Sequence, residues 1–301
     1  MLLHIIGSVL VSFLPQKGIE LPVEINLVFS ELIILVPSAV YILVKNLSFR
    51  DDLGFRPIKA GTVLMSILLS ALVTPVASFV NVLSQLFVSN KVAQMSDELS
   101  GGSNAIVLFL GALYGPFCEE LLFRAIFNNR YEKYVGPIRA GLISSLFFAL
   151  AHMNVNQAFY AFVLGMIFCV INKAAGSVYP SIIIHACVNG GNILLLFSLT
   201  KMYSTLGQGV DIAAVAEAER NSDMMYYLIG VVLVIAIICS LIAIPCVVWM
   251  SRHEGNFESL ADMFIHKHKS ANWLRVPTIL AIALVLVMMF GLNGIIGILK
   301  G

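Results

Sequence analysis

Charged side chains are scarce in this sequence. Asp, Glu, Lys and Arg together make up 12% of the 301 residues, whereas apolar residues make up 59%. A soluble domain has about 25% charged and about 45 to 50% apolar residues, and the mean hydropathy here is +0.93. This composition excludes a water-soluble globular protein and predicts a membrane protein. The formal net charge of +1 indicates neither a nucleic-acid-binding surface nor a polybasic lipid-binding face.

Several chemical signatures are also missing. The sequence contains no CxxC pair, no glycine-rich phosphate loop, no HExxH motif and no internal repeat, so thiolate zinc sites, nucleotide loops and zincin-type metalloproteases lack their residues. The cysteines are odd in number and lie within apolar segments, which argues against a disulfide framework and for small buried side chains. An apolar setting also disfavours the thiolate that a nucleophilic cysteine needs. The five are Cys118, Cys169, Cys187, Cys239 and Cys246.

Long apolar segments divide the chain. A transmembrane helix needs about 20 apolar residues to cross roughly 30 Å of hydrocarbon. Continuous runs of this kind predict an all-α, polytopic transmembrane helix bundle and exclude a barrel of alternating strands. Residues 2–14 are short for a span and fit a half-span, an interfacial helix or a tilted first helix, so we expect eight or nine membrane segments. The others are 24–44, 61–88, 104–129, 138–153, 156–172, 178–200, 225–250 and 276–298.

Basic residues are distributed unevenly between the predicted loops. Lys and Arg are concentrated in alternate loops, which are therefore predicted to be cytoplasmic. The outside loop 201–223 contains the small-residue run AAVAEAE and is expected to be a mobile loop or a short amphipathic helix, with no catalytic signature. The basic loops are 45–59, 128–139, the turn at Lys173 and 251–275, and the loops poor in Lys and Arg are 89–103 and 201–223.

Six ionisable or strongly polar side chains interrupt the apolar segments in one part of the chain. A charge at the bilayer centre costs about 2.5 to 3.5 kcal/mol on insertion scales, so such residues are expected to form a functional site. Counting 1.5 Å per helical residue from the predicted cytoplasmic ends places four of them at depths of roughly 12 to 20 Å, in one layer. The six residues are Glu119, Glu120, Arg124, His152, His185 and Asn189.

The spacing of these residues predicts how they face one another. Glu120 and Arg124 are four residues apart on one helix face, and a buried carboxylate and guanidinium there are expected to neutralise each other as an ion pair. His185 and Asn189 have the same spacing. Glu119 is turned by about 100° from Glu120 in a regular helix, so it can face another helix and take part in chemistry.

A carboxylate, two imidazoles and a carboxamide around one cavity suit the attack of water on a carbonyl group. Glu119 would accept the proton of the water as general base, with His152 orienting that water or sharing the proton. His185 and Asn189 would donate hydrogen bonds to the oxyanion. The sequence shows no activated serine in this region, so direct attack by water is favoured over an acyl-enzyme.

These residues also carry a family resemblance. EELLFR (119–124) matches EExxxR, FALAH (148–152) matches FxxxH, and HACVN (185–189) matches HxxxN, in this order on successive apolar segments. The chain thus resembles the CAAX protease and bacteriocin-processing family of intramembrane endopeptidases, which includes the type II CAAX prenyl endopeptidase. The resemblance covers roughly residues 105–200. It implies a catalytic core there, preceded by N-terminal transmembrane helices (1–104) and followed by an outside loop and two C-terminal transmembrane helices (201–301).

The resemblance implies a role for each motif residue. Glu119 would be the catalytic glutamate and His152 its partner on the attacking water, while His185 and Asn189 would form the oxyanion hole. Glu120 and Arg124 would support them. We expect no cofactor. Zinc is the alternative, with Glu119, His152 and His185 as ligands, but this would leave only Glu120 as a base, and Glu120 is needed by Arg124.

Other functions remain open from the sequence. A non-catalytic scaffold or bacteriocin-immunity protein could bind a peptide or a sensor kinase in the same cavity. A proton-coupled transporter is disfavoured because the polar groups lie in one layer. As partners we expect the lipid bilayer and a peptide or membrane-protein substrate, prenylated CAAX-like or bacteriocin- or pheromone-like, and no nucleic acid. We expect an integral multi-pass protein of a bacterial cell membrane. Glu24 and Glu31, in the first full span, are interpreted as interfacial or helix-packing residues.

Overall fold

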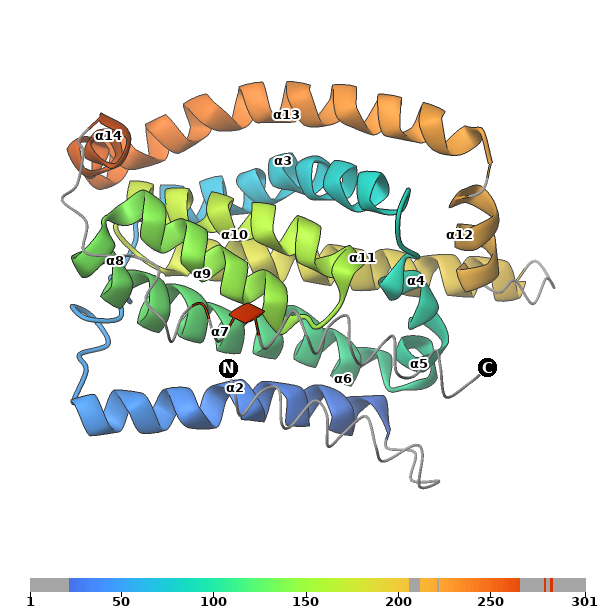
Figure 1. Ribbon diagram of the computed structural model, residues 1–301, viewed down its shortest axis with the longest axis horizontal. Coiled ribbons are helices and arrows are strands. Elements are labelled where there is room, and N and C mark those ends of the chain that lie inside the picture. Colours follow the sequence, from blue (N-terminus) through green and yellow to red (C-terminus); the bar gives the residue numbers. More distant parts are fainter. Residues whose placement is uncertain (1–21, 206–211, 221, 266–278, 280–281, 284–301) are drawn as a thin grey trace.

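All regular elements in the described part of the chain are helices (Figure 1). The computed structural model describes residues 22–205, 212–220, 222–265, 279 and 282–283. The elements are α2 (Val23–Lys45), α3 (Ala60–Ser84), α4 (Lys91–Gln94), α5 (Ser96–Gly101), α6 (Asn104–Phe109), η2 (Leu110–Tyr114), α7 (Gly115–Glu120), η3 (Leu121–Asn128), α8 (Asn129–Val135), α9 (Pro137–Ala151), α10 (Val155–Ala175), α11 (Tyr179–Thr205), α12 (Ile212–Arg220), α13 (Met224–Glu254) and α14 (Phe257–Ile265).

The predicted polytopic helical bundle is confirmed. Within the described residues, six helices are long and apolar enough to cross a membrane. One of them is the continuous 32-residue stretch Asn104–Val135, which comprises α6 through α8. The predicted segment 2–14 lies outside the described residues, and so does most of 276–298. The loop 201–223 contains the short helix α12, one of the two expected forms.

Helix α9 is shorter than a full span. Its 15 residues reach about 22 Å, compared with roughly 30 Å of hydrocarbon. His152 follows directly, and Met153 then adopts a left-handed conformation with φ +51°. Asn154 caps α10, because its side-chain oxygen accepts the Gln157 backbone N–H at 3.0 Å. This turn therefore leaves His152 inside the bilayer, at the end of a helix that stops short.

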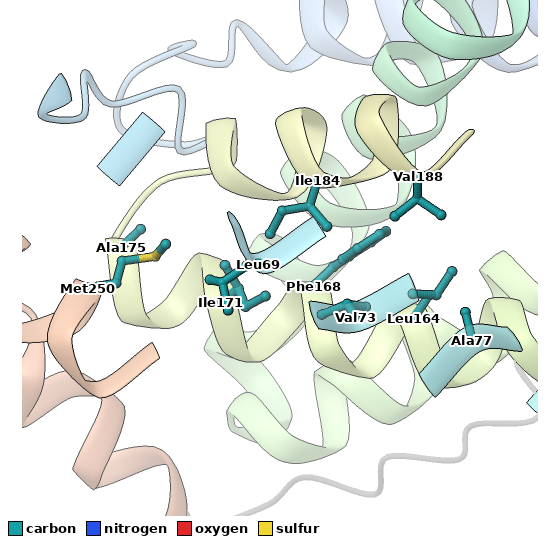
Figure 2. Packing of buried hydrophobic residues seen from close by; sticks show 10 residues of the cluster. All are labelled: Leu69, Val73, Ala77, Leu164, Phe168, Ile171, Ala175, Ile184, Val188 and Met250. Atoms are coloured by element: carbon teal, nitrogen blue, oxygen red, sulfur yellow. The ribbon is translucent and has the colours of Figure 1, made fainter. Parts of the chain in front are cut away.

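The apolar core lies where four long helices meet. Helix α3 packs against α10, α11 and α13. Figure 1 shows α13 along one side of the molecule and α2 along the opposite side, with the stretch from α6 to α8 next to α2. The core side chains drawn in Figure 2 are Leu69, Val73, Ala77, Leu164, Phe168, Ile171, Ala175, Ile184, Val188 and Met250.

Not all cysteines are buried as expected. Cys118 and Cys169 are buried, Cys239 and Cys246 are partly exposed, and Cys187 is exposed. The sequence identifies an apolar segment but not which side of its helix faces outward from the bundle, so the expectation for Cys187 was wrong.

A buried carboxamide joins three helices at the end of the bundle away from the basic loops. Asn156 is 1% exposed. Its Nδ2 donates to Asn81 Oδ1 and to Ser84 Oγ, both at 2.8 Å. Its Oδ1 accepts the Lys91 backbone N–H at 3.2 Å. Asn156 thus fastens the start of α10 to the end of α3 and the start of α4.

We predict that Asn156→Ala destabilises the protein, because it leaves the Lys91 amide and the Asn81 carbonyl without this partner. Hydrogen bonds in membrane proteins average about 0.6 kcal/mol each, so the loss of three should lower the free energy of unfolding by about 1 to 3 kcal/mol. Thermal denaturation in detergent would measure it. Asn104→Ala, at an exposed position, is the control, and equal melting temperatures of the two variants would contradict the prediction.

Candidate active site

The helix that carries Glu119 and Glu120 is irregular on both sides of them. Segment η2 precedes α7 and segment η3 follows it, and both are π-helical. Pro116, at the start of α7, has no N–H to bond the carbonyl four residues earlier, so a regular α-helix is interrupted here. Short π segments occur frequently at functional sites. The two glutamates therefore sit on one short α-helical turn whose register differs from that of a continuous α-helix.

Glu120 and Arg124 lie against each other in the interior. Arg124 Nε is 3.4 Å from Glu120 Oε2, and the two side chains are 1% and 0% exposed. The Arg124 guanidinium carbon lies 4.2 Å from the ring centre of Phe148 and 5.3 Å from that of Phe168. Its nitrogens have no hydrogen-bond partner among the described residues. The guanidinium is therefore held by one carboxylate and two aromatic faces. The supporting role of Glu120 and Arg124 in catalysis stays a prediction.

Gly165 of α10 leaves the space for this guanidinium. A Cβ added at Gly165 would lie 3.0 Å from Arg124 Nη2 and 2.8 Å from Ser145 Oγ. These distances are too short for van der Waals contact. A side chain at this position would therefore push Arg124 away from its two rings.

His185 bridges the two glutamates. Its Nδ1 is 3.2 Å from Glu120 Oε1, and its Nε2 is 3.5 Å from Glu119 Oε2. The imidazole also contacts the rings of Phe148 and Phe168, with centroid distances of 5.7 and 5.4 Å. Both nitrogens thus face carboxylates, whereas the sequence predicted that His185 donates a hydrogen bond to an oxyanion. That role stays a prediction. The sequence could not reveal the contact with both carboxylates, because α7 and α11 are distant in the chain.

His152 has a defined tautomer. Its Nδ1 is 2.9 Å from the Phe148 carbonyl oxygen. A carbonyl can only accept a hydrogen bond, so Nδ1 carries the proton and Nε2 of the neutral ring holds the lone pair. The side chain is partly exposed and lines a cavity. His152 therefore offers a proton acceptor to whatever fills that cavity.

Asn189 lies one turn beyond His185 on α11. Its Nδ2 donates to the Gly111 carbonyl oxygen at 3.3 Å, and Gly111 belongs to the π-helical segment η2. A carboxamide nitrogen has two N–H groups, so one remains for another acceptor. Asn189 also lines the cavity.

The cavity has a volume of about 420 Å³, which is within the usual range for ligand sites. His152, His185 and Asn189 all line it. Glu119 is not part of its lining, although its side chain is 17% exposed. Five of the six predicted residues are thus linked by contacts to His185 or to this cavity, and Arg124 supports them through Glu120.

A third carboxylate, Glu31, lies near the start of α7. From the sequence it was interpreted as an interfacial or helix-packing residue. Glu31 belongs to α2, and its Oε1 lies 3.4 Å from the position of a Cβ built on Gly115, at the start of α7. Its Oε2 is buried with no hydrogen-bond partner in the described chain. Glu24, by contrast, accepts the Ser103 backbone N–H at 2.7 Å, a packing contact. Its apolar surroundings marked Glu31 as unusual, but only the fold identifies its neighbour.

A zinc site requires three protein ligands in fixed geometry. Among the residues that the structure describes, no three His, Cys, Asp or Glu side chains are grouped to hold a metal ion. His185 has both nitrogens against carboxylates, and Glu120 lies against Arg124. The donor set does not fit the zinc alternative in this geometry, so no step is assigned to a metal.

Comparison with known proteins gives two matches. Residues 101–191 match the family described as type II CAAX prenyl endopeptidase Rce1-like. The chain is 28% identical over 200 residues to the membrane-embedded CAAX protease MroQ of Staphylococcus aureus (strain USA300), an alignment that covers 62% of this chain and 79% of that protein. Among solved structures there is no match. The first match contains all three motifs.

We predict that the single variants Glu120→Gln and Arg124→Met each lower the free energy of unfolding by about 3 to 5 kcal/mol, because each leaves one buried charge unpaired. The double variant should recover part of this loss. Thermal denaturation of the purified proteins would measure both effects. Glu132→Gln is the control, since the Lys173–Glu132 pair is about one quarter exposed and such pairs contribute roughly 0 to 1 kcal/mol. Single variants as stable as this control would disprove the ion-pair interpretation.

Proposed function

Because this chain belongs to the CAAX protease and bacteriocin-processing family of membrane-embedded proteases, we propose that it is an intramembrane endopeptidase that uses Glu119 to activate water. The observation that supports this proposal is the contact between the helices that contain the motifs. His185 lies against both Glu119 and Glu120 at the wall of a cavity that is also lined by His152 and Asn189. Its substrate would be a membrane-associated peptide or protein, prenylated CAAX-like or bacteriocin- or pheromone-like.

The ground state is balanced in charge. With a proton on each ring nitrogen, His185 donates to both glutamates. Together with Arg124 it then offsets the charges of Glu119 and Glu120. This is the condition that a low-dielectric interior favours. His185 therefore holds the Glu119 carboxylate in place before the substrate binds.

In the first step a water molecule lies between Glu119 and His152. The water oxygen attacks the scissile carbonyl carbon while Glu119 accepts one proton of the water. His152 Nε2 accepts a hydrogen bond from the second O–H of the water. The carbonyl π electrons move to the oxygen and form an oxyanion. The second N–H of Asn189 is available to that oxyanion.

Proton transfer changes the surroundings of His185. Once Glu119 is protonated it has lost its charge, so its hold on His185 Nε2–H weakens. That N–H can then turn to the oxyanion, which would give His185 the predicted donor role only after the attack. When the intermediate collapses, the C–N bond breaks and the leaving nitrogen takes the proton from Glu119. The glutamate is thereby restored.

We predict that Glu119→Ala and His152→Ala abolish peptide-bond cleavage while the protein still folds in the membrane, because each change removes water activation and little packing. The assay is mass spectrometry of membrane peptides incubated with the full-length protein in liposomes. Glu24→Ala is the matched control, a carboxylate on α2 that accepts the Ser103 backbone N–H. Cleavage by Glu119→Ala at the wild-type rate would refute the mechanism, and a wild-type protein that cleaves nothing would favour the scaffold alternative.

We also predict that cleavage survives exhaustive chelation and that the purified active protein contains no stoichiometric zinc, as expected if Glu119 and His152 act on water directly. Elemental analysis and activity after dialysis against a chelator measure the two quantities. Stoichiometric zinc that disappears together with activity in His152→Ala and His185→Ala would instead establish a metalloprotease, with Glu119 as a ligand.

A further inference from the structure

The active-site cavity extends toward the outer side of the membrane. Besides His152 and His185, its lining includes Asn90 of α4, Leu99 of α5 and Ile212 of α12. These three helices belong to the loops poor in Lys and Arg, which the charge distribution assigns to the outside. Figure 1 shows α4, α5 and α12 together at one end of the bundle and α8 and α14 at the other.

The short helix α9 explains this direction. It rises about 22 Å from its cytoplasmic end and stops at His152, which leaves roughly 8 Å of a 30 Å hydrocarbon layer beyond it. The cavity occupies part of that space. His152 is therefore closer to the outer surface than to the cytoplasmic one along α9.

The cavity wall is mainly apolar. Among its lining residues in the described chain there is no Lys, Arg, Asp or Glu. Its polar side chains include carboxamides, which can donate and accept hydrogen bonds. The carboxamides are Asn81, Asn90, Gln157, Asn189 and Asn192.

Asn81, Asn90 and Asn189 each have one polar group of the side chain bonded within the protein, and Asn81 Oδ1 accepts from Asn156 Nδ2. Asn90 Oδ1 accepts the Ala93 backbone N–H at 3.2 Å, which leaves its N–H groups for a ligand. Asn189 Nδ2 donates to Gly111, which leaves its oxygen. A donor and an acceptor fixed in this way can pair with the C=O and N–H groups of an extended peptide backbone.

We propose that this cavity binds an uncharged, extended segment from the interior of a polypeptide, which enters from the outer side of the membrane. A free terminal carboxylate, or an Asp or Glu side chain, would be buried here without an unpaired cation, because both nitrogens of His185 already face Glu119 and Glu120, and it would lose its hydration. The main-chain groups of an uncharged segment would find partners along the wall. Cleavage of that segment rests on the proposed function, but its binding does not.

Cysteine labelling tests the side of entry. In the full-length chain with its five native cysteines replaced by Ala, Leu99→Cys and Asn192→Cys each place a thiol in the cavity wall, and Leu47→Cys places one in the basic loop 45–59. A membrane-impermeant maleimide added to intact cells should label both cavity thiols, and Leu47→Cys only after permeabilisation. Labelling of Asn192→Cys only from the cytoplasmic side would overturn the proposal.

Protection from labelling tests the chemistry of the occupant. An acetylated and amidated decapeptide of Ala, Val, Leu and Ser should slow the labelling of Leu99→Cys at least about fivefold in liposomes. The same peptide with a central Asp, or cut at its centre to a free carboxylate, should slow it less than about twofold. Equal protection by all three peptides, or none by the uncharged one, would overturn the proposal.

A charge introduced into the wall completes the test. Asn192→Lys, combined with Leu99→Cys, should let the Asp peptide protect as well as the uncharged peptide does in the parent, because the ammonium group pairs with the carboxylate. Asn192→Gln is the neutral control and should not change the order of the peptides. If the Asp peptide still protects less than the uncharged peptide in Asn192→Lys, the proposal that the wall offers no cation to a carboxylate is contradicted. Since labelling requires no hydrolysis, these results stay interpretable in a protein that cleaves nothing.

Discussion

The buried guanidinium of Arg124 is the constraint on which the arrangement of the site depends. A charge within a bilayer must be balanced by its neighbours, because no bulk water is available to solvate it. Three helical segments meet this demand. Helix α7 supplies Glu120, α9 supplies Phe148, and α10 supplies Phe168 and the space at Gly165. The position of each helix around the cluster is thereby coupled to the others, and a shift of one would leave a charge or an aromatic face without its partner.

This coupling extends from Glu120 to the residues that face the cavity. Glu120 also contacts His185, and the opposite nitrogen of the same ring lies by Glu119. The adjacent glutamates thus serve different purposes: one is fixed in the interior, and the other is partly exposed. The π-helical segments before and after α7 allow this, because they change the register in which neighbouring residues leave the helix.

The sequence predicted the parts of the structure that depend on local patterns. Apolar run length placed the ends of α2, α9 and α10 within a few residues, since each run must match the bilayer or end at a turn. The i, i+4 spacing brought Glu120 and Arg124 together. What the sequence did not contain was the register change around Pro116 and the contacts between distant helices. The approach of His185 to both glutamates and of Glu31 to Gly115 depends on tertiary packing, which no single segment encodes.

The length of α9 connects these features to the way a substrate could reach the site. A helix of full length would have carried His152 to the outer surface and closed the space above it with its own side chains. Instead the chain turns at Met153 inside the bilayer, and Asn156 fastens the returning helix to α3 and α4. The hydrogen bonds of Asn156 satisfy the backbone and side-chain groups that this early turn brings to membrane depth. The same early turn leaves His152 beside a cavity whose lining includes five carboxamides, so the position of this candidate site residue and the space next to it follow from one shortened helix.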